Sequence, residues 1–105
     1  MQNITDWISG WMASQCDGDW EHEYGIKTET TDNPGWSVTI DLADTAWENL
    51  EFDWILIEID DNNWYGYKVK NKKFFGTGDL NKLELLLEKF KELIENNDRM
   101  PGFNK

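Results

Sequence analysis

The strongest constraint on the fold is a helical pattern near the end of the chain. Apolar residues recur there on one face, with the period of about 3.6 that marks an amphipathic helix, at Leu83, Leu86, Leu87, Phe90, Leu93 and Ile94. We expect Asp79 to cap this helix and residues 96–98 to end it. A helix with a single apolar face must bury that face against another element, so the rest of the chain has to supply a second layer.

A second helical pattern opens the chain. Its apolar residues follow the spacing i, i+3, i+4, i+7 and i+8, at Ile4, Trp7, Ile8, Trp11 and Met12. Asn3 or Thr5 is a suitable N-cap for this helix. The helix should end near Cys16, because a turn-forming Asp-Gly-Asp sequence follows that residue.

Between the two helices the apolar period falls to two, the period of a strand. We predict strands over residues 21–31 and 36–42, which form a hairpin with one buried face. A type II turn is expected between them, with Gly35 at the position that requires a positive φ. Residues 43–50 are ambiguous, and Asp44 or Thr45 could cap a short helical turn there.

Three more strand patterns follow. Residues 52–59 are apolar on both faces, so we expect both faces to be covered in part. After a turn at 60–63, residues 64–70 predict the returning strand, and 72–75 a short final strand whose lysines suit a sheet edge. Glycines at 76 and 78 then predict a turn into the last helix.

These elements predict an α+β fold. It comprises an N-terminal helix, an antiparallel sheet of four or five strands, and a C-terminal amphipathic helix packed on one face of the sheet. At 105 residues, the chain is expected to form a single domain over 1–105, with a loosely ordered tail at 98–105.

The charge is strongly acidic and uneven. The chain has 21 Asp and Glu against 10 Lys and Arg, a net charge of −11, and residues 1–60 carry 14 of the acids and only one base. Nucleic acid and anionic membranes would repel such a surface, so we expect neither as a partner. A basic protein partner is the natural complement, although acidity also keeps a protein soluble.

The remaining composition indicates a cytoplasmic protein. No run approaches the roughly 18 apolar residues that would span a bilayer. Residues 1–6 lack the basic and apolar parts of a signal peptide. Cys16 is the only cysteine, which excludes an internal disulfide and fits a reducing compartment.

No catalytic or metal-binding pattern is complete. Cys16 has acidic neighbours and no cation beside it to stabilise a thiolate, which disfavours a nucleophilic role. Asp17, Asp19 and Glu21 alternate as in a calcium loop, but the glycine and the bidentate glutamate of such a loop are missing. His22 is the only histidine and has no partnered nucleophile. We therefore predict no catalytic residue, no metal and no cofactor.

The tryptophans divide into two groups. Four fall on faces expected to be buried, namely Trp7, Trp11, Trp36 and Trp54. Trp64 lies at a strand start beside Asp60 and Asp61, which is the composition of an interface hot spot that faces a basic partner. Partial packing of Trp64 in the core is the alternative.

The first half of the chain contains several uncommon strings, namely QCDGDWEH at 15–22, YGI at 24–26, DNPGW at 32–36 and IDL at 40–42. These strings resemble the immunity protein 53 family of bacterial polymorphic toxin systems. The similarity extends from about Trp7 to Phe90 and includes FGTG at 75–78.

The resemblance implies an α+β inhibitor without enzymatic activity that binds a cognate toxin domain inside the producing cell. Many toxins of such systems are nucleases with basic clefts, so an acidic surface could occupy the cleft as a phosphate mimic. The expected contacts lie at two acidic turns, comprising Asp17, Asp19, Glu21 and Glu23, and Asp60, Asp61 and Trp64. The alternatives are an acidic structural or interaction subunit of a homo-oligomer and, third, a small enzyme that uses Cys16 or His22.

Overall fold

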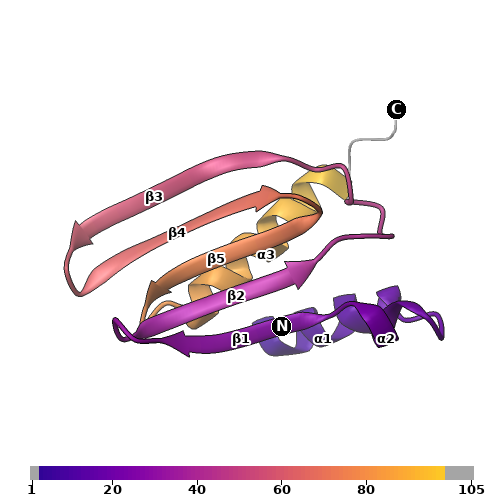
Figure 1. Ribbon diagram of the computed structural model, residues 1–105, viewed down its shortest axis with the longest axis horizontal. Coiled ribbons are helices and arrows are strands. Elements are labelled where there is room, and N and C mark those ends of the chain that lie inside the picture. Colours follow the sequence, from indigo (N-terminus) through magenta and orange to yellow (C-terminus); the bar gives the residue numbers. More distant parts are fainter. Residues whose placement is uncertain (1–2, 99–105) are drawn as a thin grey trace.

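A computed structural model describes residues 3–98. Along the chain it contains α1 (Ile4–Gln15), α2 (Trp20–Glu23), β1 (Ile26–Thr31), β2 (Gly35–Asp41), β3 (Phe52–Asp60), β4 (Asn63–Lys70), β5 (Lys73–Asp79) and α3 (Leu83–Asp98). The strands form one antiparallel sheet in the order β1-β2-β5-β4-β3, and α1 and α3 lie together behind it (Figure 1). The predicted α+β fold is confirmed. The loose tail was predicted for residues 98–105. Apart from Asp98, these residues lie outside the part of the chain that the structure describes.

The first helix forms as its sequence predicts. The Asn3 side chain accepts a hydrogen bond of 2.8 Å from the Asp6 amide and caps α1. The helix ends at Gln15, and the Cys16 amide closes the last turn on the Ala13 carbonyl. None of the helices within residues 3–98 is long and apolar enough to cross a membrane.

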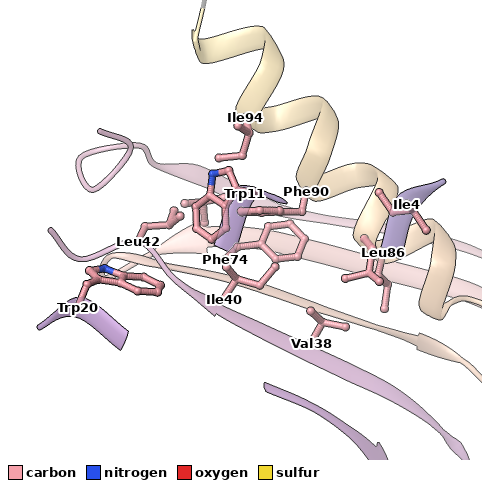
Figure 2. Packing of buried hydrophobic residues seen from close by; sticks show 12 residues of the cluster. Ile4, Trp11, Trp20, Val38, Ile40, Leu42, Phe74, Leu86, Phe90 and Ile94 are labelled. Atoms are coloured by element: carbon pink, nitrogen blue, oxygen red, sulfur yellow. The ribbon is translucent and has the colours of Figure 1, made fainter. Parts of the chain in front are cut away.

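The core lies between the two long helices and the centre of the sheet (Figure 2). Val38 and Ile40 of β2, and Leu42 directly after it, are fully buried, as the alternation of that segment predicts. Phe90 of α3 packs edge-on against both Phe74 and Trp11, with ring centroids 5.2 Å and 5.0 Å away. The apolar face of α3 thus finds the second layer that it requires.

The predicted final strand at 72–75 is present as β5, but its predicted short length and its position at a sheet edge are wrong. β5 runs to Asp79 and is the central strand of the sheet, between β2 and β4. Its glycines are needed for close packing and not for a turn, because a Cβ at Gly76 would lie 3.1 Å from Leu86 Cδ2 of α3. Asp79 ends β5 and does not cap the helix, which begins only at Leu83.

Two further local predictions are wrong. Residues 21–23 belong to the short helix α2, and the strand begins at Ile26. Gly35 is the first residue of β2 and has no positive φ, since Gly18 is the one described glycine with φ in that region. The predicted hairpin itself is present, with Thr31 paired to Gly35.

β3 is exposed over most of its length, contrary to the expectation that both of its faces are covered in part. It is the outermost strand of the sheet, whereas α3 packs on β2 and β5. Trp54, Leu56 and Ile59 are therefore 44%, 50% and 70% exposed. The run of apolar residues marks an uncovered edge strand and not a buried one.

Candidate functional site

The first acidic turn, residues 16–23, holds its own shape with two of its carboxylates. Asp17 Oδ1 accepts hydrogen bonds from the amides of Trp20 (2.9 Å) and Asp19 (3.0 Å). The Glu21 carboxylate accepts from the amides of Asp17 and Gly18 at 3.1 Å and 3.0 Å. These bonds stabilise the entry into α2.

The same amides act on the acidities of these groups. The Trp20 amide, followed by that of Asp19, lowers the pKa of Asp17. The pKa of Glu21 is lowered by its own amide and by those of Asp17 and Gly18. Both side chains are therefore ionised at neutral pH, and both stabilise the loop through their hydrogen bonds to its amides.

Trp20 anchors this turn to the core. Its indole is buried, donates a hydrogen bond of 2.8 Å to the Ala43 carbonyl, and packs edge-on against Trp11. His22 and Cys16 are exposed on either side. Asp19 and Glu23 are also exposed, and their carboxylates have no hydrogen-bond partner within residues 3–98.

The second acidic turn joins β3 to β4. Asp60 Oδ1 accepts a hydrogen bond of 2.8 Å from the Asn62 amide and so shapes the turn, while Asp61 is exposed. Trp64 follows at the start of β4, half-buried, and its amide donates to Asp79 Oδ2 at 2.9 Å. Asp79 thus ties the turn to the centre of the sheet.

Asp79 is the buried carboxylate of this region. Besides the Trp64 amide, it accepts hydrogen bonds from the Asn81 amide (2.8 Å) and from Lys82 Nζ (2.7 Å). Burial alone raises the pKa of Asp79, but the lysine and the two amides outweigh it, so the pKa lies below its ordinary value.

A groove of about 870 Å³ opens beside the second turn, where three connections of the chain meet at one end of the sheet (Figure 1). Its lining residues are Asn33, Pro34, Leu56, Glu58, Asp61, Asn62, Trp64, Asp79, Leu80 and Asn81. The lining contains three carboxylates and no basic residue. Leu80, which is 54% exposed, adds an apolar contact at the rim.

The two predicted acidic turns do not form one site. The first turn precedes Ile26, which pairs with Ile40, while the groove lies at the opposite end, where Gly35 pairs with Asp79. The structure adds Leu56, Glu58 and Leu80, which the sequence interpretation missed. Glu58 follows four consecutive apolar residues of this strand, and its charge was the available signal that this face meets solvent.

The groove lies apart from the residues considered for catalysis or metal binding. Within residues 3–98, no group of three or more Cys, His, Asp or Glu side chains is placed to hold a metal ion. The carboxylates of the groove are separated from both Cys16 and His22 by the length of the sheet.

Comparison with known protein families decides the class of this protein. Residues 5–95 match the family described as immunity protein 53. The chain belongs to the immunity protein 53 family. Membership implies that this immunity protein neutralises a toxin and is not an enzyme, which removes the enzymatic alternative built on Cys16 or His22. No curated protein and no solved structure matches this immunity protein significantly.

Proposed function

We propose that this immunity protein binds a basic cleft of its cognate toxin domain through the acidic groove and the β3–β4 turn. The contact residues are Glu58, Asp60, Asp61 and Trp64. Binding takes place inside the producing cell and blocks access to the toxin's cleft. If that cleft binds a nucleic acid, the carboxylates occupy the positions of phosphates.

The observation that carries the proposal is a groove rich in carboxylates and without a base in its lining. The whole chain has a net charge of −11, which gives the protein a negative electrostatic field. The four ion pairs within residues 3–98 engage only Asp41, Glu48, Asp79 and Glu92. Glu58 and Asp61 take part in none of these pairs. Such a field speeds the approach of a basic partner and repels acidic ones.

The groove is a better contact than the first acidic turn. Asp17 and Glu21 are engaged with the amides of their own loop, so a partner would compete with bonds that stabilise the fold. Trp64 offers the groove a partly exposed aromatic anchor, the type of residue that contributes most to interface energies. In the first turn the corresponding tryptophan, Trp20, is buried.

Paired charge reversals test the proposal. Glu58→Lys with Asp61→Lys should slow association with the toxin domain encoded beside this gene by about tenfold or more at low ionic strength. Asp60 is left intact because its side chain shapes the turn. The variant should also fail to protect cells that produce the toxin.

The matched control reverses Asp19 and Glu23, which changes the net charge equally at the opposite end of the sheet. Its association rate should fall by only a small factor. Equal losses in both variants would show that net charge, and not the groove, directs binding. Unimpaired binding by the groove variant would contradict the proposal.

A further inference from the structure

The outer edge of β3 is the most unusual surface of this protein. β3 is nine residues long and pairs only with β4, so the backbone groups on its other side have no strand to bind within residues 3–98. We infer that this edge receives an extended strand of the toxin domain, which extends the sheet. The inference rests on the proposed function and names how the partner is held.

The opposite edge of the sheet shows how a protected edge looks in this same protein. β1 is six residues long, carries Lys27, and presents mainly threonine and charged side chains to solvent. Short, polar, lysine-bearing edges discourage pairing with other chains. β3 is longer and contains no lysine, arginine or proline. Its three carboxylates, on Asp53, Glu58 and Asp60, and the two irregularities in its pairing with β4 leave the apolar run between Trp54 and Ile57 as the open part of the edge.

Both faces of β3 carry apolar side chains that are open to solvent. Leu56 pairs with Gly66 on the face away from α3 and lines the groove, next to Trp54. Ile57 pairs with Tyr65 on the other face, and Ile59 near the strand end is 70% exposed. An added strand would bury side chains on both sides while it satisfies the free backbone groups.

Charge selects the occupant. Residues 51–61 carry five carboxylates, on Glu51, Asp53, Glu58, Asp60 and Asp61, and no base. A second copy of the chain would bring another five carboxylates to the same edge, and each copy has a net charge of −11. A toxin strand with alternating apolar and basic side chains would contact the apolar side chains of β3 and be attracted to its carboxylates.

The test places a lysine on each edge of the sheet. Leu56→Lys and Ile59→Lys should each weaken affinity for the adjacent-gene toxin domain by about tenfold or more, because edge lysines oppose strand pairing. Both side chains are half-exposed or more, so the fold should tolerate the change. Thr28→Lys and Thr30→Lys, exposed on β1, add the same charge at the other edge and should change affinity by less than about threefold.

Amide hydrogen exchange of the wild-type complex supplies an independent reading of the backbone. Amides along β3 should become strongly protected when the toxin domain binds, while those along β1 stay unchanged. Wild-type affinity in the β3 variants, absent protection of β3, or dimerisation of the isolated protein through β3 would each overturn the inference. If the wild-type protein binds the toxin domain and protects cells but does not use β3, the inference about the strand edge is wrong and the proposed function stands. If the wild-type protein does not bind the toxin domain, the proposed function itself is wrong.

Discussion

The Trp54 indole stacks on the Phe75 ring across the intervening strand, with the ring centroids 6.4 Å apart and the planes inclined by 28°. Trp54 belongs to β3 and Phe75 to β5, so the indole has to pass over β4. It does so at Gly66, where a Cβ would lie 2.6 Å from Trp54 Cζ2 and 2.9 Å from the Ile55 carbonyl oxygen. Gly66 of β4 therefore leaves room for Trp54 to cross the sheet surface and fasten the edge strand β3 to the central strand β5.

Gly66→Ala should destabilise the protein by about 1–3 kcal/mol, because the new methyl group displaces Trp54 and presses on the β3 backbone. Urea unfolding measures the difference. Gly10→Ala is the control, since a Cβ at this position in α1 meets nothing within 4 Å and should stabilise the helix by about 0.5–1 kcal/mol. Equal stability of Gly66→Ala and wild type would show that Trp54 does not depend on the glycine.

Trp11→Ala should cost about 3–5 kcal/mol of unfolding free energy, since Trp11 is buried and packs against Phe90, Trp20 and Trp47. Trp54→Ala removes an equally large side chain that is 44% exposed and should cost much less. Thermal or urea unfolding of the two variants compares them directly. A similar loss in both would mean that Trp54 supports the fold as much as the core does.

The contrast between these tryptophans shows where sequence patterns suffice. The helix at Ile4–Gln15 and the buried alternation along β2 follow from local period, because one packed face determines which residues are apolar. For Trp54 the pattern gives the opposite answer. Two apolar faces are expected both of a covered central strand and of an exposed binding edge, and only the strand order distinguishes them.

The central position of β5 in the sheet could not be predicted from the sequence pattern for a related reason. Gly76 and Gly78 suggest a turn locally, whereas a central strand uses them to admit Leu86 and Lys82 of the following segment. Trp64 and its acidic neighbours could be identified from composition, but Leu80 and Glu58 join them only through strand pairing and the chain reversal after β5.

Asp79 should make stability depend on pH in the acid range. Its pKa is lowered in the folded protein from the ordinary value of 3.8, so its contribution is complete above that value. The contribution is lost as the pH falls from 3.8 through the lower folded-state pKa, since the unfolded chain binds the proton first. Asp79→Asn should remove about 1–3 kcal/mol at neutral pH and flatten this dependence. Unfolding curves for both proteins between neutral and acid pH provide the check; parallel curves would contradict it.

Trp64→Ala should weaken binding to the toxin domain by at least about 2 kcal/mol, the loss expected of an aromatic anchor at an interface. Trp64→Phe keeps an aromatic ring at the rim of the groove and should retain most of the affinity. Calorimetric titration measures both, and circular dichroism checks that the folds are the same. Binding by Trp64→Ala at wild-type strength would remove this residue from the contact.

The most direct test of toxin neutralisation through an acidic surface is a titration of this protein with the toxin domain encoded beside its gene, at low and at high ionic strength. We expect a tight complex whose association rate falls steeply as salt rises, because salt screens the field that steers the partners together. A folded protein that does not bind this domain, or that binds it equally fast at both ionic strengths, would contradict the account.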